Sequence, residues 1–574
     1  MDGIALIQAE GPLPVLPGGL CELARVGPAH LVAEQDAIVS MSGRAVLIGY
    51  AFSRESHSPF TSLTPGTADM IIGSEGAWAI RNLWGSYVLV WADPENRVFV
   101  LRSPLTGPAI FQTSRRIGDR RSGAGAAHCA FTDLGIARSL GFALDRPDVG
   151  AIDAYLRYPL LRAARTTLEG VTEILPGEVS RLDRPGRGAA SWLPWDYAAS
   201  PPRRADPGEL AGIVRKCVGA WSGRFGRIQL ELSGGIDSSI VAACLAERGG
   251  EWRAVTMVTA EPDGDERPYA QAVADRVHVP LAEVRIPSEP ADPMEAVAPP
   301  RVRPGGFGLI APTDAALLAS AQAFGADAIF SGTAGDGAFG YQTSIAPALD
   351  ALHYRGVRAA LGAARDQARI MDDNIWNALR HGVRGYVHGI RLWPVDDFLL
   401  SRRHASALPE HPWLAGAERV PPGIRRYGLG ILPIQPFLDG YGRSRVLPKI
   451  APLLSQPLIE FGLGVPSWQW GEGGVNRALA REAFRTELPA IVLNRRSKGR
   501  ILSMFVPAFE RHRRRLSDYL LDGWLAGAGV IDVDAIEDLM SGSAPVDTPD
   551  MLRVLQFVDI ENWARSVIGS SRPG

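Results

Sequence analysis

The sequence contains few cysteines and no long apolar run. Its 574 residues include four cysteines, and none stands in a CxxC pair or another metal-ligand spacing, so a zinc centre is disfavoured. A formal net charge of -2 and a pI of about 6.6 argue against a strongly basic nucleic-acid-binding protein. No run of about 18 apolar residues suggests a transmembrane helix, and the first residues lack signal-peptide features. We expect a cytoplasmic protein with no nucleic-acid or membrane partner.

Lysine is also scarce. The 60 basic residues include only Lys216, Lys449 and Lys498, and the others are arginine. Lysine carries a compact, titratable ammonium that arginine does not provide. A lysine kept in such a sequence is therefore a candidate for a specific role.

The chain divides into two parts at a proline- and charge-rich stretch, 194–207, which is the best linker candidate. Before it, β-rich runs predict strands at 45–48, 87–91 and 97–102. After it, apolar runs alternate with helical patterns, which is typical of a parallel α/β sheet. Strands are expected at 228–232, 254–259, 282–286 and 328–330, and helices at 267–277 and 313–323. Beyond about residue 345 the pattern is mostly helical. We expect domains over 1–200 and 201–574.

The most informative segment is the turn Ser233–Ser239, which reads SGGIDSS between a predicted strand and a predicted helix. Glycines let backbone N–H groups approach phosphate oxygens, and a helix N-terminus supplies positive partial charge. The serine hydroxyls add donors, and Asp237 suits a bridging Mg²⁺. An ordinary capped turn is the alternative. The segment is neither a Walker A loop nor a GxSxG elbow.

This heptapeptide resembles the pyrophosphate-binding PP-loop of the asparagine-synthetase-like ATP pyrophosphatases. Those enzymes cleave ATP between its α and β phosphates, adenylate a carboxylate, and let an amine displace AMP. The resemblance implies that ATP is bound by Ser233, Gly234, Gly235, Asp237, Ser238 and Ser239. It also implies that the strand at 254–259 contributes adenine-binding backbone, within Met257 to Thr259.

A second glycine-rich segment, Ser331–Gly337, follows the predicted strand at 328–330. It is similar to the family's SGxGxD signature, except that Ala334 replaces the middle glycine. The similarity implies that Ser331 and Gly332 bind ATP and that Asp336 holds Mg²⁺ together with Asp237. A glycine-rich surface turn remains the alternative. The meeting of the two aspartates is expected from the fold, because they are far apart in the chain.

Near the C-terminus, Asn494–Gly499 resembles the family's late lysine motif. The resemblance implies that Lys498 is catalytic and stabilises the negative charge that develops during acyl transfer. A solvated charge on a basic loop is the alternative. No general base can be named from the residues; Glu266 and a substrate phosphate are both open.

Residues 80–115 resemble the N-terminal glutaminase domain of asparagine synthetase, which implies an Ntn-type αββα sandwich ahead of a helix-rich PP-loop domain with a parallel β-sheet. That glutaminase uses an N-terminal cysteine as its nucleophile, whereas Asp2 stands at this position here. The domain is therefore expected to be degenerate, and the amine is expected to come from the substrate or a second substrate.

Two related groups lack that cysteine, the β-lactam synthetases and the lasso peptide cyclases. The former carry a tyrosine where this chain has Thr333, which is too weakly acidic for the same role. The segment 452–458, Arg477, residues 495–499 and the chain length resemble the cyclases. The resemblance implies ATP and Mg²⁺ as cofactors. It also implies adenylation of an Asp or Glu side chain in a precursor peptide, with macrolactam closure by the N-terminal amine and release of AMP and pyrophosphate.

The same resemblance implies three partners, which are the precursor peptide, a leader peptidase and a leader-binding protein. Two alternatives remain open. One is another amide-forming synthetase, either of the β-lactam type or a glutamine-independent asparagine synthetase. The other is a scaffold that binds the precursor without catalysis.

Overall fold

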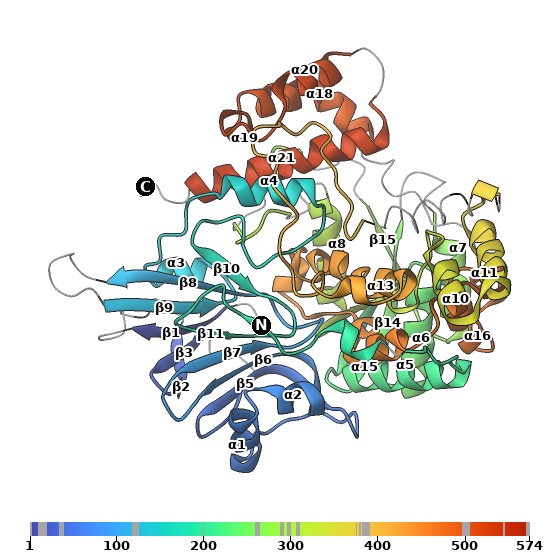
Figure 1. The fold of residues 1–574 in the computed structure, drawn as a ribbon, viewed down its shortest axis with the longest axis horizontal. Helices are drawn as coiled ribbons and strands as arrows, with labels where there is room; N and C mark the ends of the chain where they lie inside the picture. The colour runs from blue at the N-terminus through green and yellow to red at the C-terminus, as the bar shows by residue number, and fades with distance from the viewer. Residues whose placement is uncertain are drawn as a thin grey trace.

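The fold combines antiparallel and parallel sheets with many helices, as the computed structural model in Figure 1 shows. The structure describes residues 3–9, 16, 20–33, 39–117, 125–198, 200–258, 265–286, 292–295, 300–305, 310–374, 376–377, 380, 391–495, 506–542 and 546–569. Two predicted site residues, Thr259 and Lys498, lie outside these ranges. Within them, no helix has the length and apolar character needed to cross a membrane.

Two antiparallel sheets form the N-terminal part. The first has the order β10-β8-β9-β1-β3-β2, with β1 at Ile4–Ala9, β2 at Cys21–Val26, β3 at Ala29–Ala33, β8 at Ile110–Ile117, β9 at Gly125–Phe131 and β10 at Val171–Ile174. The second has the order β12-β11-β7-β6-β5-β4, with β4 at Val39–Ser42, β5 at Ala45–Ser53, β6 at Leu83–Ala92, β7 at Val98–Arg102, β11 at Glu178–Arg181 and β12 at Ala189–Ala190. The strands predicted at 45–48, 87–91 and 97–102 are confirmed as β5, β6 and β7.

Alternation along the strands explains the packing of these sheets, because successive side chains point to opposite faces. Val88 and Val90 of β6 enter a core shared with Ile4 and Leu6 of β1, so the two sheets pack face to face. Leu89 of β6 belongs to a different core. That second core also contains residues of α1 (Pro65–Gly73) and α2 (Ala77–Asn82).

The outer side of the first sheet is also covered by helices. Ala5 and Ile7 of β1 share a core with α3 (Leu134–Ser139) and α4 (Val149–Arg157). The layers therefore run helix, sheet, sheet, helix. The same core includes α18 (Val506–Leu521), α19 (Trp524–Gly527), α20 (Val533–Ser541) and α21 (Thr548–Gly569), so the last helices of the chain pack on this first half.

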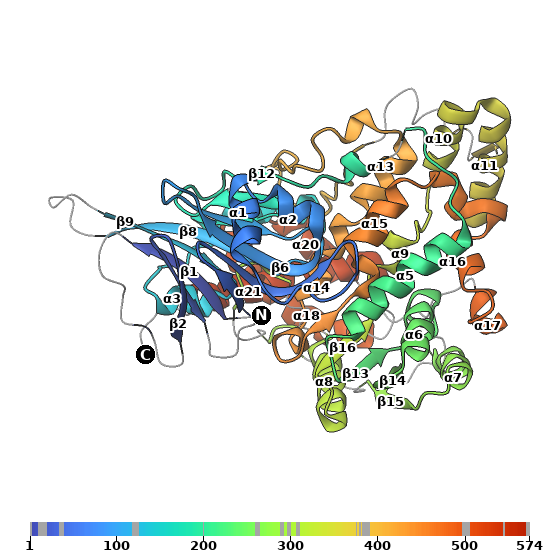
Figure 2. The ribbon, with the colours of Figure 1, turned by 90° about the horizontal axis from the view of Figure 1, so that it is seen from below.

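A parallel sheet forms the other side of the molecule (Figure 2). Its order is β15-β14-β13-β16-β17, with β13 at Arg227–Glu231, β14 at Glu251–Val258, β15 at Leu281–Arg285, β16 at Ala328–Ser331 and β17 at Lys449–Ile450. The accompanying helices are α5 (Pro207–Ser222), α6 (Ile236–Arg248), α7 (Arg267–Arg276) and α8 (Ala311–Phe324). The four predicted strands and the two predicted helices are confirmed. β17 was not predicted, because two residues show no periodicity.

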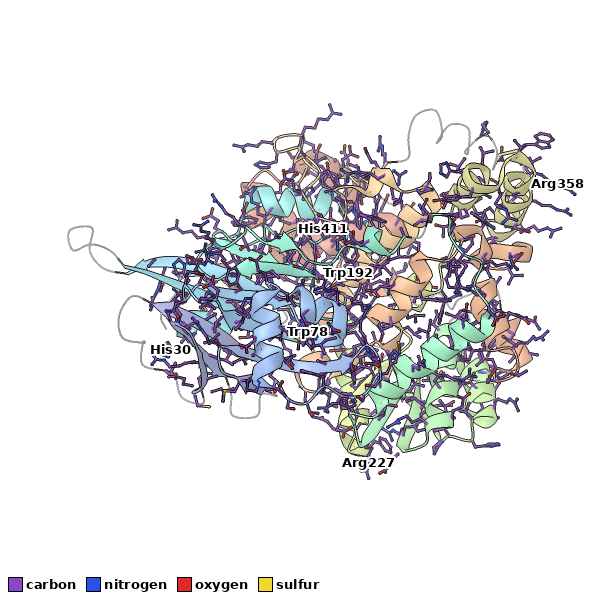
Figure 3. The ribbon with its side chains drawn as sticks, turned by 60° about the horizontal axis from the view of Figure 1, so that its bottom comes forward. His30, Trp78, Trp192, Arg227, Arg358 and His411 are labelled. Atoms are coloured by element: carbon purple, nitrogen blue, oxygen red, sulfur yellow. The ribbon has the colours of Figure 1, made fainter. Side chains whose placement is uncertain are left out.

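The region beyond residue 345 is mostly helical, as predicted. Its helices include α10 (Ala346–Arg355), α11 (Val357–Ile370), α13 (Pro422–Leu429), α14 (Pro436–Asp439), α15 (Gln456–Leu463), α16 (Ala478–Ala483) and α17 (Ala490–Leu493). One of them, α15, joins the two sides of the molecule: Glu460 pairs with Arg54 and accepts a 2.8 Å hydrogen bond from the indole of Trp192. Trp192, labelled in Figure 3, is buried at this boundary.

Candidate functional site

Two glycine-rich loops meet at the carboxyl ends of the central strands β13 and β16, where open parallel sheets bind ligands. β13 leads through residues 233–235 into α6, and β16 leads through residues 332–334 into α9 (Gly335–Ala338). A Cβ atom at Gly332 would lie 2.5 Å from the backbone nitrogen of Ser238. A Cβ atom at Gly335 would lie 2.3 Å from the Cβ atom of Asp237. Glycine at both positions therefore allows the two loops to touch.

The first loop has the shape of an anion cradle. Gly234 adopts a left-handed backbone with φ of +64°, and a Cβ atom there would lie 2.3 Å from that of Tyr269 on α7. Gly235 caps α6 with no side-chain hydrogen bond to the helix N-terminus. The first N–H groups of α6 therefore receive no side-chain cap, as a phosphate-binding helix requires.

The serine hydroxyls of this loop differ in their surroundings. Ser233 and Ser238 line the cavity at the loop, whereas Ser239 is fully buried and donates a 2.8 Å hydrogen bond to the carbonyl of Gly235. Ser239 thus supports the first turn of α6. Its predicted contact with ATP, like that of Gly234, stays a prediction.

Arg477 joins the two predicted metal ligands. Its Nη1 atom lies 2.8 Å from Oδ2 of Asp237 and 2.7 Å from Oδ1 of Asp336. The arginine side chain is 8% exposed, and its backbone is left-handed with φ of +59° at the start of α16. The structure therefore brings the two aspartates together, as expected from the fold, and places a guanidinium between them.

These two carboxylates fit Mg²⁺. Mg²⁺ in nucleotide sites takes oxygen ligands from one or two carboxylates and from substrate phosphates. The described residues contain no group of three or more His, Cys, Asp or Glu side chains that could hold a metal ion by themselves. The donor set is thus that of a metal held jointly with a nucleotide, rather than of a permanent metal centre.

A cavity of about 630 Å³ lies over the two loops, within the usual range of ligand pockets. The predicted residues Met257, Ser331 and Gly332 line it, together with Val255 and Leu317, which supply an apolar wall suited to a purine ring. The backbone role of Met257 stays a prediction, because Met257 also pairs with Val284 in the sheet.

Two further arginines organise the rim of this cavity. Arg495 pairs with Glu266 at 2.7 Å, donates to the carbonyl of Ser233 at 3.2 Å and lies 4.1 Å over the ring of Tyr269. Glu266, one of the open candidates for a general base, is therefore ion-paired. Arg481 donates to the carbonyls of Leu493 and Arg495, and so holds the backbone at the start of the predicted lysine motif.

A second cavity, of about 960 Å³, adjoins the first and shares Asp336 and Tyr341 with it. Its walls are mainly apolar and include Trp393, Tyr427 and Trp470. The guanidinium of Arg477 lies 5.1 Å over the ring of Tyr341. The second cavity therefore reaches Asp336, one of the two carboxylates of the first.

Arg477, Arg495 and Tyr341 were not predicted as site residues. Arg477 stands in a segment that resembles the family's site cover, but its contact with both aspartates joins three distant parts of the chain. Only the excess of acidic over basic residues in the two loops could have indicated that a cation is needed there.

The comparisons with known proteins follow this geometry. The chain matches a model of the family described as asparagine synthase over residues 215–402 and 439–565, which together make up more than half of the chain. Among curated proteins, none matches significantly. The matched residues include both glycine-rich loops, Arg477 and the parallel sheet. Family membership indicates an ATP-dependent amide-forming synthetase, and the chain belongs to the asparagine synthase family.

Proposed function

We propose that the protein is an ATP-dependent lasso peptide cyclase. It adenylates the side-chain carboxylate of an Asp or Glu in a precursor peptide and closes a macrolactam with the peptide's N-terminal amine. AMP and pyrophosphate are the other products. The proposed partners are the precursor peptide, a leader peptidase and a leader-binding protein.

The size and lining of the second cavity carry this proposal. A free aspartate would fill only a small part of about 960 Å³ and would meet mainly apolar walls. A folded peptide segment would bury apolar side chains against Trp393, Tyr427 and Trp470, and could direct one carboxylate toward Asp336 and Tyr341. The arginines that line this cavity, Arg391, Arg425 and Arg426, could bind acidic groups of the peptide.

The loop residues have defined tasks in this reaction. The glycine-rich turn and the N-terminus of α6 bind the β and γ phosphates through N–H groups. Asp237 and Asp336 would hold Mg²⁺, which neutralises phosphate charge when bound. Arg477, within 3 Å of both aspartates, holds them in place and adds positive charge where the pyrophosphate leaves. Lys498 is proposed to stabilise charge in the acyl-transfer step.

In each step of the reaction, one bond forms and one bond breaks. A carboxylate oxygen of the peptide attacks the α phosphorus of ATP, and the bond to pyrophosphate breaks. The peptide amine then attacks the acyl carbon, loses one proton, and releases AMP. A cavity that holds the peptide folded makes this second step intramolecular, which can contribute about 7–11 kcal/mol.

The structure of the N-terminal half supports the proposal that the attacking amine does not come from glutamine. Its helix–sheet–sheet–helix layers fit a degenerate Ntn-type glutaminase domain over residues 1–200, followed by the synthetase domain over 201–574. Cys129, which pairs with Ile7 of β1, is fully buried, and burial raises the pKa of its thiol. A buried neutral thiol is a poor nucleophile.

Substrate-dependent ATP–pyrophosphate exchange tests the proposal. The candidate acids are aspartate, a β-amino acid precursor, and leader-free peptides with Asp or Glu at positions seven to nine. Exchange with a peptide, AMP release and loss of one water in mass spectrometry are the expected results. Exchange with a small carboxylate alone would identify another amide-forming synthetase. ATP binding without exchange in the presence of the cognate precursor and its partners would identify a scaffold.

A further inference from the structure

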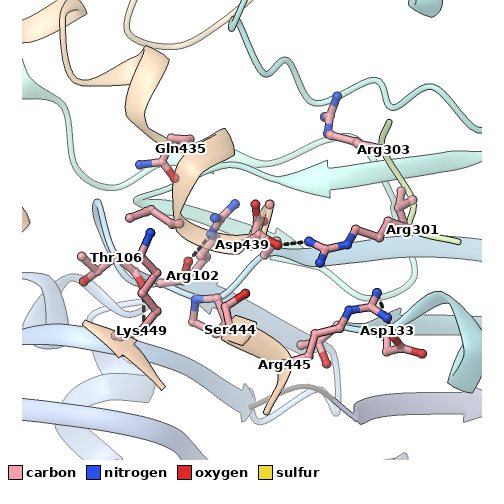
Figure 4. A pocket seen from close by; sticks show the side chains of 18 of the residues that line it. Arg102, Thr106, Asp133, Arg301, Arg303, Gln435, Asp439, Ser444, Arg445 and Lys449 are labelled. Atoms are coloured by element: carbon pink, nitrogen blue, oxygen red, sulfur yellow. Dashed lines mark hydrogen bonds and ion pairs between the residues drawn. The ribbon is translucent and has the colours of Figure 1, made fainter. Parts of the chain in front are cut away.

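A separate cavity of about 200 Å³ lies between the antiparallel sheets and the parallel-sheet side (Figure 4). Its walls come from both halves of the chain. Arg102 and Thr106 come from β7 and the segment after it, while Arg301, Asp439 and Lys449 come from the other half. Among the predicted site residues that the structure describes, none lines this cavity.

Positive charge dominates the lining. Of the residues that the structure describes, six cations and two carboxylates, Asp133 and Asp439, line the cavity. The cations are Arg102, Arg162, Arg301, Arg303, Arg445 and Lys449. A third carboxylate, Glu173, lies behind the wall and accepts hydrogen bonds of 2.7 Å from Arg102 and from Arg303. The cations therefore still outnumber the carboxylates.

The carboxylates present are already engaged. Glu173 neutralises two guanidiniums at once, and Asp439 holds Arg162 through two hydrogen bonds of 2.8 and 2.6 Å. Asp133 lies 3.7 Å from Arg445, which is a long ion pair. Unbalanced charge inside a protein is unfavourable unless a counter-ion or hydrogen-bond partners accompany it.

Lys449 is the clearest case. Its Nζ atom lies 3.7 Å from the ring centroid of Tyr441. The two carboxylates that act on it, Glu231 and Asp314, are both paired with Arg443. Burial lowers the pKa of Lys449 to about 8, with Arg443 acting in the same direction and Glu231 opposing it. Figure 4 shows Lys449 and Arg102 on one side of Asp439, and Arg301 and Arg445 on the other.

We propose that this cavity binds a small oxyanion, a carboxylate or a phosphate group, which Lys449 holds at the end of the cavity where Arg102 lies. The anion supplies the negative charge that the lining lacks, and its contacts join the two halves of the molecule. Planar carboxylates and tetrahedral phosphates both match arginine and lysine donors, and the cavity volume admits only a small molecule. The proposal does not depend on the cyclase function.

Calorimetric titration of the whole chain with inorganic phosphate and, separately, with succinate tests the proposal. The chain is first saturated with ATP and Mg²⁺, without peptide, so that phosphate cannot be counted at the glycine-rich loop. We expect one site per chain, weakened by 0.5 M salt because charge dominates binding. The probe that binds more tightly identifies the anion class. A separate titration with ATP shows whether the chain binds the nucleotide. If it does not, the titration with succinate still tests the proposal.

The variant Lys449→Met should weaken binding of the preferred probe about tenfold or more. Lys216→Met is the matched control, because Lys216 is exposed on α5, and it should bind as the unmodified chain does. If Lys449→Met does not fold, Lys449→Gln, which keeps a polar end on the side chain but no charge, gives the same test. Binding of neither probe at 10 mM, or equal binding by the unmodified chain and both cavity variants, would overturn the proposal.

Discussion

The two charged cavities of this protein differ in their balance of charge: among the described residues, four carboxylates and four guanidiniums line the first, whereas six cations and two carboxylates line the second. At the glycine-rich loops, two carboxylates lie close together and the guanidinium of Arg477 contacts both. Between the halves, guanidiniums and an ammonium surround few carboxylates, and Glu173 alone holds two of them. The difference shows which partner each cavity lacks: the first is suited to a metal–nucleotide complex, and the second to an anion.

Removing a carboxylate from the first cavity should have the largest effect. Asp336→Asn should lower the rate of ATP–pyrophosphate exchange about 10²- to 10³-fold, because one oxygen ligand for Mg²⁺ is lost while the fold is retained. Exchange kinetics measure the effect, and Asp69→Asn, at an exposed position on α1, should change nothing. Unchanged exchange in Asp336→Asn would remove this aspartate from the proposed metal site.

Removing a carboxylate from behind the second cavity should affect stability instead. Burial alone would raise the pKa of Glu173, but Arg303, Arg162 and Arg102 outweigh it and lower that pKa to about 2. Glu173→Gln leaves two buried guanidiniums without their anion and should reduce the free energy of unfolding by about 3–5 kcal/mol. Urea unfolding at pH 7 measures this loss.

The pH dependence follows from the direction of that shift. A lowered pKa means that the stabilisation by Glu173 is present above the ordinary glutamate pKa and is lost as the pH falls toward 2. Glu482→Gln removes the partner of Arg485 in an exposed ion pair and is the control with no measurable change. An equal change in the free energy of unfolding for both variants would mean that the buried ion pairs of Glu173 stabilise the fold no more than an exposed pair does.

Removing the cation between the aspartates should change the affinity for Mg²⁺ and the exchange rate in opposite directions. Arg477→Met should lower the exchange rate about 10- to 100-fold, because positive charge at the leaving pyrophosphate is lost. Half-saturation should nevertheless need less Mg²⁺, since the two carboxylates then repel each other and attract a dication more strongly. Exchange at varied Mg²⁺ measures both values. Arg485→Met, at an exposed position nearby, should change neither. A lower rate with unchanged Mg²⁺ dependence would contradict a guanidinium that competes with the metal.

A further buried carboxylate, Asp350, gives the prediction with the smallest expected effect. Asp350 accepts hydrogen bonds from the N–H groups of Gly423 and Ile424 and from the hydroxyl of Ser467, and burial raises its pKa to about 6. Because the folded state holds the proton more tightly than the unfolded state, stability should fall by on the order of 1–3 kcal/mol as the pH rises from about 4 to about 6.

Urea unfolding across this pH range measures the slope. Asp350→Asn should flatten it, whereas Asp69→Asn should leave it as in the unmodified chain. A slope that persists in Asp350→Asn would assign the titration to another group.

Much of the fold could be predicted from the sequence because its elements follow local patterns. The apolar runs at 228–232 and 328–330 are long enough to show strand character, and they place both glycine-rich loops at one edge of the sheet. By contrast, β17 has two residues and no pattern, and its pairing with Ile329 depends on a contact distant in the chain.

The candidate site was predictable only in part, for the same reason. Asp237 and Asp336 stand in motifs whose chemistry is local, so their residue types indicated a metal–phosphate role. The bridge through Arg477 depends on a left-handed arginine and on three separate segments, which no local pattern reports. The need for glycine at position 335 likewise depends on Asp237, about a hundred positions away, which an added Cβ atom would overlap.

The packing of α21 on α3 and α4 has a consequence for how the protein is made. Arg553 of α21 donates to the carbonyl of Leu156, and Arg138 of α3 donates to that of Val567. On the ribosome, roughly 400 residues must be added after the first sheet is complete, which takes roughly 20–80 s at ordinary elongation rates. Throughout that interval the apolar surface of α3 and α4 lies open to the cell. Until α21 is added, this surface is therefore a site at which nascent chains can aggregate.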